Sequence, residues 1–451
     1  MKKTFNIYLS SALLAVVLLP SCSKEIGSLN GPAIEDITTN PTQFQLNNVV
    51  VGTEAGIRNN LDFYLDATGV IGREMYRFAS SEPRYTSDLL GKGDLQLNNN
   101  TFYLTNSWNS RYRAVKDCNI LIEGATNSTK ITAPQKKGYL GFAKMIKAYE
   151  LLINLNLTYT NGIRVDVANI DQPGPFLDYA ASLTAIAALL DESKADLTGS
   201  EILFKLSGGL LGGTSNALGD AAVPSVDWLI KVNRALAARI AAYRQKWPDV
   251  LTYLAESFYD PNADFYFGVY HVFSTGPNDQ TNLAYVPQNS AGEIRLAHPS
   301  YHADVLAESA TDDRAGKATK RDEAASQDDL ASDWDVWVYT AQTAPIPIIR
   351  NEEMILLNAE ALINIGGGSN LTNAVALLNR IRTGHHAAVY GGGITQAELI
   401  TEMLLQRRFS LYFEGHRWID MRRYNRLNQL PIDRPNDDVF DRFPRPLTEG
   451  Q

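Results

Sequence analysis

Apolar residues recur at helical spacing through much of the chain. Residues 136–157 carry Leu140, Ala143 and Leu151 in such a pattern, which predicts an amphipathic helix. The same spacing occurs in three further segments: 178–197, 226–244 and the residues that follow Pro248. The break at Trp247-Pro248 is short, so we expect the last two of these helices to form an antiparallel hairpin.

The C-terminal third repeats this pattern. Residues 350–364 predict a helix with Met354 and Leu357 on one stripe, ended by the glycines at 366–368. A second helix follows, and Thr395 with Glu398 fits a capping box for a third. Helix pairs joined by tight turns resemble tetratricopeptide units, although the consensus of that repeat is poorly matched. The pattern predicts a mainly α fold built from helical hairpins.

Two long segments lack this periodicity. Residues 60–110 and 260–347 are rich in Tyr, Asp, Asn, Pro and Ser. Long irregular loops inside a compact protein are usually functional. We therefore expect ligand contacts to come from these segments.

The N-terminus has the pattern of a lipoprotein signal. Lys2 and Lys3 precede an apolar run from Leu9 to Leu19, which is shorter than the ~20 residues of a spanning helix. The run ends in Leu-Pro-Ser-Cys22, which fits a lipobox whose cysteine thiol would be alkylated by diacylglycerol. The prediction is a signal peptide at 1–21, a lipid-anchored tether at 22–40 and a single domain at 41–451. The alternative is an ordinary secretory signal with a chance cysteine.

The charge and the cysteine content of the chain limit its binding partners and its disulfide chemistry. The formal net charge is −9, and loss of Lys2 and Lys3 would leave 39 basic against 50 acidic residues. An acidic balance argues against a nucleic-acid partner. With Cys22 lipidated, Cys118 is left alone, so we expect it to be a buried small hydrophobic residue.

Residues 405–424 pack arginines, acids and Trp418 around one glycine. Glu414–Arg417 and Asp420–Arg423 lie at i,i+3 spacing, where side chains on a helix meet. This density predicts an ordered ion-pair network around a half-buried tryptophan.

Several segments, in order, resemble the SusD/RagB family of Bacteroidetes outer-membrane lipoproteins. Gln406 and Ser410 stand where that family commonly has glutamates. Besides the lipobox, the segments that carry the resemblance are Trp108-x-x-x-Tyr112 with Asn119, Lys231–Arg239, Arg350–Ala361, Arg407–Arg423 and Pro444-Arg-Pro446 with Glu449.

The resemblance implies a helical scaffold with tetratricopeptide-like units and an irregular face that captures a nutrient, usually an oligosaccharide. It implies a lipid-anchored, surface-exposed outer-membrane protein that covers a TonB-dependent, SusC-like transporter. The signature helices would be structural. No cofactor and no enzymatic activity are expected.

The strongest candidate ligand group is in the middle segment. Trp337 and Tyr339 are two residues apart and share a face on an extended chain, and Trp334 adds a third ring. Sugars stack on such rings while acids such as Asp335 bind hydroxyl groups. The segment has few basic residues, which favours a neutral oligosaccharide. The alternative interpretation is a strand that carries core aromatics.

A second candidate group would suit acidic glycans. It consists of Tyr76, Arg77, Arg84 and Tyr85, and further tyrosine candidates are Tyr266, Tyr270 and Tyr301.

Other chemistry is less well supported. His298 and His302 have metal-ligand spacing, but Pro299 lies between them and no glutamate follows the first histidine. His385-His386 lies in a glycine-flanked loop, so we expect both side chains to be exposed. A lipid-anchored glycoside hydrolase would need an acid pair in a cleft, and the sequence indicates none. A peptide-binding, RagB-like protein is the main rival on ligand class.

Overall fold

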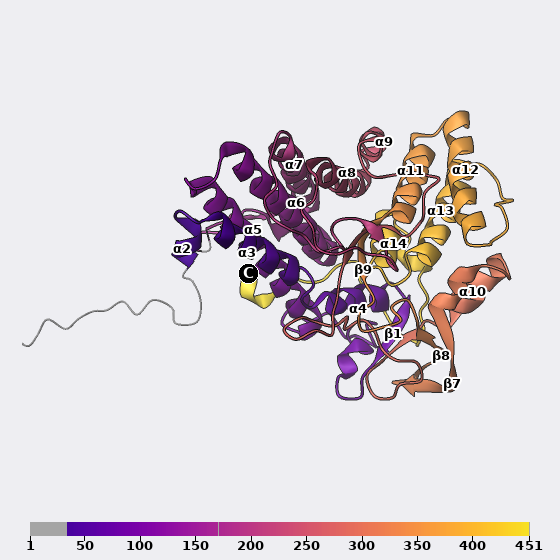
Figure 1. Cartoon of the computed structure of the whole chain (residues 1–451). Helices are drawn as coiled ribbons and strands as arrows, with labels where there is room; N and C mark the ends of the chain where they lie inside the picture. Colours follow the sequence, from indigo (N-terminus) through magenta and orange to yellow (C-terminus); the bar gives the residue numbers. More distant parts are fainter. Residues whose placement is uncertain (1–33, 170, 451) are drawn as a thin grey trace, which may run out of the picture.

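The computed structural model describes residues 34–169 and 171–450, and helices are its main regular structure (Figure 1). The predicted signal peptide and Cys22 lie outside the described residues. The α-helices are α2 (Ile34–Thr38), α3 (Gln43–Gly56), α4 (Leu61–Ile71), α5 (Phe102–Asn127), α6 (Ala133–Thr158), α7 (Tyr179–Leu197), α8 (Val226–Tyr243), α9 (Trp247–Ala255), α10 (Ser300–Glu308), α11 (Asn351–Ile365), α12 (Gly368–Gly384), α13 (Gln396–Ser410) and α14 (Arg417–Arg423).

The strands form small antiparallel sheets. One has the order β1-β6-β8-β7, a second β4-β5-β9, and the third pairs β2 with β3. The strands are β1 (Met75–Phe78), β2 (Ile163–Arg164), β3 (Phe176–Leu177), β4 (Gly213–Thr214), β5 (Phe267–His271), β6 (Ile294–Ala297), β7 (Ala318–Gln327), β8 (Leu330–Val336) and β9 (Ile346–Arg350). Short 3₁₀ helices include η1 (Pro83–Tyr85) and η3 (Asp313–Lys317).

The helices occupy two groups in Figure 1. Helices α5 to α8 pack on one another in chain order on one side, and α11 to α13 pack together on the other. The sheet that contains β1, β8 and β7 lies below the second group. One large apolar core runs through most of the molecule, and a smaller one lies between α11, α12 and α13.

Local sequence explains where the helices begin and how closely they pack. Thr132 and Gln135 form a reciprocal capping box at the start of α6, and Thr395 and Glu398 do the same for α13, as predicted. At Gly141 of α6, a Cβ would lie 2.5 Å from the Cγ of Leu197, so only glycine lets α7 approach this closely. The mainly α fold class and the helical hairpins are confirmed.

Motifs far apart in the sequence hold the scaffold together. The indole N–H of Trp108 donates to Glu449 over 3.0 Å, which joins α5 to the last described residues. Arg239 of α8 forms an ion pair of 2.6 Å with Glu353 of α11. These contacts are buried and structural, as the resemblance implied for the signature helices.

The two non-periodic segments contain more regular structure than predicted. Helix α4 lies within 60–110, and nearly all of its residues are buried, so it has no polar face and no amphipathic pattern. Strands β5 to β8 and helix α10 lie within 260–347. The alternation of β7 is hidden because it carries consecutive charges at 320–323, where its register with β8 shifts.

The predicted tether boundary is also too late. Residues 34–38 form helix α2, which packs against α5, and Asn127 donates to the carbonyl of Thr38 over 2.9 Å. Among the described residues, no helix has both the length and the apolarity needed to cross a membrane.

The charged C-terminal region differs in one ion pair. Asp420 pairs with Arg423 at 3.3 Å as predicted, but Glu414 pairs with Arg350 and not with Arg417. Glu414 lies in the turn between α13 and α14, where Gly415 has a φ of +81°, so the i,i+3 geometry of a helix does not apply. Trp418 is completely buried, not half-buried, and Cys118 is buried as predicted.

Candidate functional site

Four of the candidate aromatic residues line one cavity of about 360 Å³, named here the aromatic cavity. They are Tyr266, Tyr270, Trp337 and Tyr339. Charged residues complete the lining: Asp313, Arg314, Lys317, Arg350 and Glu414.

Strands and a short helix position these side chains. Tyr270 lies in β5, which pairs with β9, and its hydroxyl donates to the carbonyl of Tyr266 just before the strand. Trp337 follows β8, and its backbone N–H donates to the carbonyl of Lys317 over 2.7 Å. The loop that carries the tryptophan is therefore fixed to η3, which carries the charged wall.

Trp337 differs in its indole N–H from the tryptophans of helices α5, α8 and α14. Trp108, Trp228 and Trp418 each donate to a protein acceptor, at 3.0, 2.8 and 2.7 Å. Within the described residues, the indole N–H of Trp337 has no such acceptor, and the ring is only half-buried. A buried indole N–H usually has a partner, so this group is available to a ligand.

Tyr266 and Tyr339 differ in how much of each ring is exposed. Tyr266 is 41% exposed, and the Arg350 guanidinium lies 5.5 Å from its ring centroid, a cation–π contact that holds the ring. Tyr339 is 4% exposed, and its hydroxyl donates to the carbonyl of Phe413 over 3.0 Å. Tyr266 and Trp337 are thus the rings with a free face, and Tyr339 is a wall.

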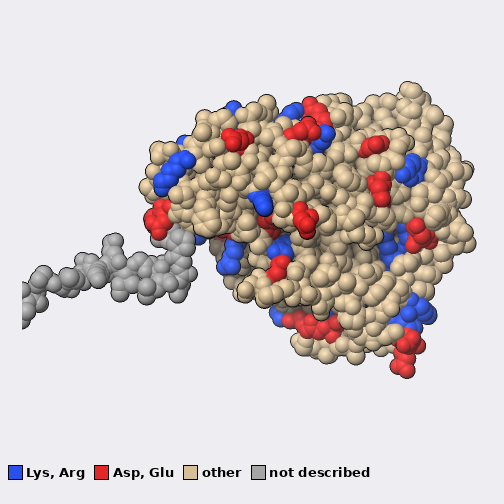
Figure 2. Space-filling model, in the orientation of Figure 1, with Lys and Arg blue, Asp and Glu red and all other residues tan. Residues whose placement is uncertain are grey.

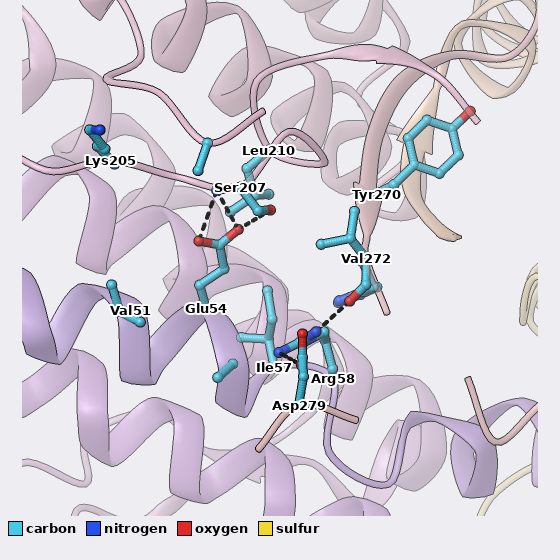
Figure 3. Close-up of a pocket in the computed structure, with 13 residues that line it drawn as sticks. Val51, Glu54, Ile57, Arg58, Lys205, Ser207, Leu210, Tyr270, Val272 and Asp279 are labelled. Carbon is cyan, nitrogen blue, oxygen red and sulfur yellow. Dashed lines mark hydrogen bonds and ion pairs between the residues drawn. The ribbon is translucent and has the colours of Figure 1, made fainter. Parts of the chain in front are cut away.

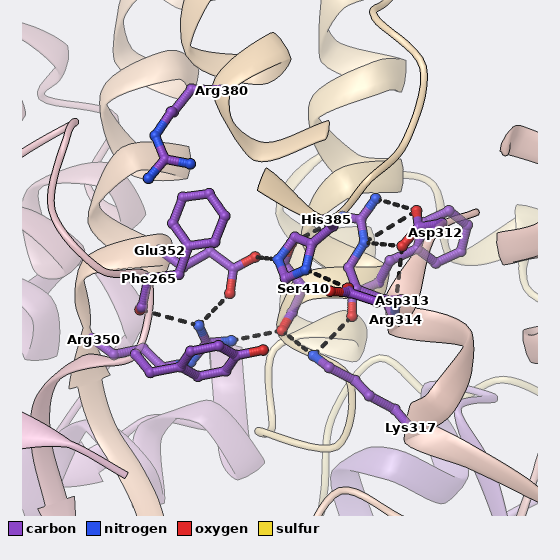
Figure 4. Close-up of polar contacts among 12 residues, drawn as sticks. Phe265, Asp312, Asp313, Arg314, Lys317, Arg350, Glu352, Arg380, His385 and Ser410 are labelled. Atoms are coloured by element: carbon purple, nitrogen blue, oxygen red, sulfur yellow. Dashed lines mark hydrogen bonds and ion pairs between the residues drawn. The ribbon is translucent and has the colours of Figure 1, made fainter. Parts of the chain in front are cut away.

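An ion-pair network supports the floor of the cavity (Figure 4). Arg350 bridges Glu352 and Glu414, at 2.9 Å from the latter. His385 lies between Asp313 and Glu352, with 2.7 Å to each carboxylate. Burial disfavours the charge of Glu352, but Arg350 and His385 hold its pKa well below the usual range. The carboxylates are therefore committed to structural pairs.

Lys317 is the exception in this network. Its ammonium donates to the carbonyls of Phe409 and Ser410, at 3.0 Å from the former (Figure 4). Among the described residues, no carboxylate lies within ion-pair distance of it. Burial and the nearby Arg350 lower the pKa of Lys317 to about 8. One ammonium N–H remains for a ligand acceptor, because two carbonyls occupy only two of its three.

The remaining residues of the first candidate group lie elsewhere. Trp334 is in β8, and its ring stacks on His302 at a centroid distance of 3.8 Å, with Lys320 5.1 Å from the ring. Asp335 is buried in the same strand, where it pairs with Arg321 and accepts from the N–H of Asn289. Trp334 and Asp335 therefore belong to the β7–β8 sheet, not to the aromatic cavity.

The second candidate group does not form a shared site. Tyr76 and Tyr85 are buried core residues, and Arg77 packs over Tyr85 and contacts Asp66 at 3.3 Å. Arg84 is exposed and pairs with Glu82 at 2.5 Å. None of these residues lines the aromatic cavity.

The histidines have structural partners. His298 contacts Asp433 at 2.9 Å, while His302 stacks on Trp334, so the two do not converge. Within residues 34–169 and 171–450, no cluster of His, Cys, Asp and Glu has the arrangement of a metal site. The expected exposure of His385 is wrong, because its side chain is 2% exposed and lies between two carboxylates. The side chain of His386 is 72% exposed, as expected.

Sequence patterns ranked some cavity residues too low. Tyr266 and Tyr270 were only further candidates, although Tyr266 offers an exposed ring, while Tyr301 is a core residue stacked on Tyr412 at 3.9 Å. Lys317 had no local signal at all. Its position depends on carbonyls almost one hundred residues away.

The face of the molecule seen in Figure 2 carries no charged patch that would suggest a second binding site. Acidic and basic side chains are interspersed there among uncharged residues, without an extended patch of one sign (Figure 2).

Comparison with known proteins shows a match to one family model over part of the chain and a fold shared with solved structures. Residues 306–443 match the model of the SusD family. A SusD superfamily protein from Bacteroides vulgatus has 16% identity and a TM-score of 0.65, over 90% of this chain and 96% of that chain. Surface glycan-binding protein A from Bacteroides uniformis has 15% identity and a TM-score of 0.62, over 85% and 88%. A laminarin-binding SusD-like protein has 15% identity and a TM-score of 0.61, over 91% and 97%.

A comparison with curated protein sequences gives no match. The family match and the structural matches together confirm the predicted resemblance to the SusD family.

Proposed function

We propose that this chain, a SusD family protein by its family match and fold, binds an oligosaccharide in the aromatic cavity and delivers it to a TonB-dependent outer-membrane transporter. The observation that carries the binding proposal is the half-buried Trp337, whose indole N–H has no acceptor among residues 34–169 and 171–450, beside the exposed ring of Tyr266. Sugar rings present apolar C–H faces to such aromatics and hydroxyl groups to the polar wall.

The polar wall can hold sugar hydroxyls without catalysing their hydrolysis. Lys317 offers a donor, and Asp313 keeps half of its side chain exposed although it pairs with His385. The hydrogen bond from His385 holds the pKa of Asp313 below its usual range, so this carboxylate is an acceptor at neutral pH. We propose a binding protein and not a hydrolase, because Glu414 and Glu352 are both occupied by Arg350.

The structural neighbours support this ligand class. One is described as a surface glycan-binding protein and another as laminarin-binding. Their ligands are properties of those proteins, and for this chain they motivate the choice of β-glucans as first probes.

The binding experiment compares single variants on the same glycan. A glycan array identifies the ligand, and calorimetry then measures wild type, Trp337→Ala, Tyr266→Ala and the control Trp334→Ala. We expect losses of roughly tenfold for the first two and no change for the control, since each aromatic contact contributes on the order of 1 kcal/mol. Affinity should vary little with salt because stacking is not screened.

Two results would contradict the proposal. Equal affinity of Trp337→Ala and wild type would place the site elsewhere. Binding of a peptide library but of no glycan would support the peptide-binding alternative.

Anchoring and localisation are part of the same proposal. We expect Cys22 to carry the lipid that holds the protein on the outer-membrane surface, after removal of residues 1–21. Cys22→Ala should then move the protein from the outer-membrane fraction to the soluble or unprocessed fraction. Unchanged lipid labelling in that variant would rule out this anchor. The partner is tested on the wild-type protein: if no TonB-dependent transporter co-purifies with it from solubilised membranes, the proposed partner is ruled out.

A further inference from the structure

A second cavity of about 280 Å³ lies against α3 and is named here the α3 cavity (Figure 3). Helix α3, the segment around Ser207 and the residues after β5 enclose it. Its volume lies below the range of roughly 300–1,000 Å³ that is usual for drug-sized ligands. It is also smaller than the aromatic cavity of about 360 Å³.

Glu54, near the end of α3, and Arg58, two residues beyond that end, carry opposite charges that point away from each other across this space (Figure 3). Because the helix ends at Gly56, the two side chains do not form the i,i+4 pair that an acid and a base make within a helix. Instead, the Glu54 carboxylate accepts from the backbone N–H and the hydroxyl of Ser207, with the N–H at 3.1 Å (Figure 3). Arg58 donates to the carbonyl of Val272 and pairs with Asp279 at 2.9 Å. The gap between the two charges is part of the cavity.

The charges of Glu54 and Arg58 are only partly neutralised by their neighbours. Burial raises the pKa of Glu54, so a positive group beside it would stabilise the carboxylate. Asp279 is an exposed partner of Arg58 and can be displaced by another carboxylate. His271 lines the same cavity almost completely buried, and within the described residues its Nδ1 has no hydrogen-bond partner.

The rest of the lining is mainly aliphatic, with Lys205 as a further charged residue. The apolar wall consists of Val51, Ala55, Ile57, Leu210, Ala221 and Val272. The ring of Tyr270, the only aromatic carbocycle among the lining residues, points away from Glu54 and Arg58 (Figure 3). Without a free aromatic face, the cavity lacks the stacking surface that a sugar uses.

The wall opposite α3 is rigid. At Gly208, a Cβ would lie 1.7 Å from the carbonyl oxygen of Gly219, and at Gly209 it would lie 2.4 Å from that of Tyr270. Leu206 and Ala222 pair through both backbone hydrogen bonds. This packing fixes Ser207 and with it the position of the Glu54 carboxylate, so the site is preorganised.

From this arrangement we propose that the α3 cavity binds a free aliphatic α-amino acid. The ammonium group lies beside Glu54, the carboxylate binds Arg58 in place of Asp279, and the aliphatic side chain contacts Val51, Leu210 and Val272. Two opposite charges on neighbouring atoms, next to an aliphatic group, are the combination that distinguishes this ligand class from sugars, fatty acids and amines. The site is separate from the aromatic cavity and independent of the glycan proposal.

Calorimetry with L-leucine and its two half-ligands tests the charge requirement. The probes are L-leucine, 4-methylpentanoate, which lacks the ammonium group, and 3-methylbutylamine, which lacks the carboxylate. We expect leucine to bind wild-type protein and each half-ligand to bind at least roughly tenfold more weakly, because a hydrogen bond to a charged group is lost. Failure of leucine to bind, or equal binding of a half-ligand, would overturn the proposal.

Two conservative variants locate the site. Glu54→Gln keeps the shape of the side chain and should weaken leucine binding roughly tenfold or more while leaving the binding of 4-methylpentanoate unchanged. Asp279→Asn removes the competitor of the ligand carboxylate and should strengthen leucine binding several-fold. Folding is checked by circular dichroism, and the gain of affinity in Asp279→Asn is a result that a purely structural role of these residues would not produce.

The remaining outcomes separate this proposal from neighbouring ones. Trp337→Ala should bind leucine like wild type, and Glu54→Gln should bind the identified glycan like wild type. Tighter binding of leucyl-leucine than of leucine would assign the cavity to peptides and overturn the free amino acid. Binding of glucose that is lost in Glu54→Gln would overturn it in favour of a sugar.

Discussion

The aromatic cavity and the Trp418 cluster contain the same residue types, but these residues are buried and paired in the cluster and partly open in the cavity. The Trp418 cluster, defined as Arg407, Trp418, Asp420, Arg422 and Arg423, also combines one tryptophan with arginines and an acid. There, Trp418 is fully buried, its N–H donates to the carbonyl of Phe440 over 2.7 Å, and Arg422 lies 4.6 Å from its ring. In the cavity, Trp337 is half-buried and its indole N–H has no acceptor within the described residues.

The difference teaches how to separate a structural aromatic residue from a binding one. A buried indole that donates to the protein and is covered on its faces has nothing left to offer a ligand. A partly open ring with an unused donor does. Composition and charge density are similar in the two regions, so only the partners of each group distinguish them.

Arg350 lines the aromatic cavity, and its substitution should have the largest effect. Arg350→Met removes the countercharge of Glu352 and Glu414, whose side chains are 0% and 7% exposed. Breaking a buried ion pair costs roughly 3–5 kcal/mol, and two stranded carboxylates place this variant at the upper end. Urea unfolding measures it, and Arg442→Met, at an exposed pair, is the matched control with an expected change within about 0.5 kcal/mol.

Trp418→Ala tests the structural side of the comparison alone. The indole is completely buried and packs edge-to-face on Phe443 at 5.9 Å, so we expect a loss of roughly 3–5 kcal/mol in unfolding free energy. Ligand affinity should be unchanged at temperatures where the variant is folded. Loss of binding with a wild-type melting curve would move Trp418 from the scaffold to the site.

The helical scaffold could be predicted from the sequence because its signals are local. The capping box at Thr395, the break at Gly366 and the apolar spacing of Met354 and Leu357 each lie within a few residues of the feature that they predict. Helix α4 escaped prediction because it is buried on all sides and has no polar face. The pairing of Glu414 escaped prediction because Glu414 lies in a turn between α13 and α14, whereas i,i+3 spacing presupposes a continuous helix.

The candidate site could be predicted only in part. Trp337 and Tyr339 were found because two aromatics two residues apart are visible in one segment. Trp334, in the same segment, turns to the sheet and stacks on His302, which no local pattern indicates. Lys317 reaches the cavity through carbonyls at the end of α13, a contact that depends on tertiary packing.

A pair of conservative substitutions sharpens the comparison within the cavity itself. Tyr339→Phe removes the hydrogen bond to the buried carbonyl of Phe413 and should cost roughly 1–3 kcal/mol of stability with little change in glycan affinity. Trp337→Phe removes an unpartnered N–H and should lower affinity several-fold with a stability change below about 1 kcal/mol. Thermal melts measure the stability of both variants, and calorimetry measures their glycan affinity. A loss of affinity in Tyr339→Phe together with a loss of stability in Trp337→Phe would contradict the prediction.

The smallest effect concerns pH and the support beneath the cavity. Burial opposes the charge of His385, but Glu352 and a hydrogen bond to Asp313 raise its pKa above the usual value. A raised folded-state pKa contributes stability that is fully present below the unfolded value of about 6.5 and is lost as pH rises through the folded value. The stability difference between wild type and His385→Gln should therefore be largest near pH 5.5–6.5 and smaller at pH 8.5.

The comparison with His385→Gln isolates this histidine from its neighbours. Lys317, with its pKa of about 8, titrates in both proteins and cancels in the difference. Urea unfolding at constant ionic strength from pH 5.5 to 8.5 gives the measurement, and His386→Gln, at a side chain 72% exposed, serves as the control. A difference that is constant over this range would mean that the imidazole acts in its neutral form, as a hydrogen-bonding spacer between Asp313 and Glu352. The floor of the aromatic cavity would then be held by geometry, without the charge that the bridged carboxylates favour.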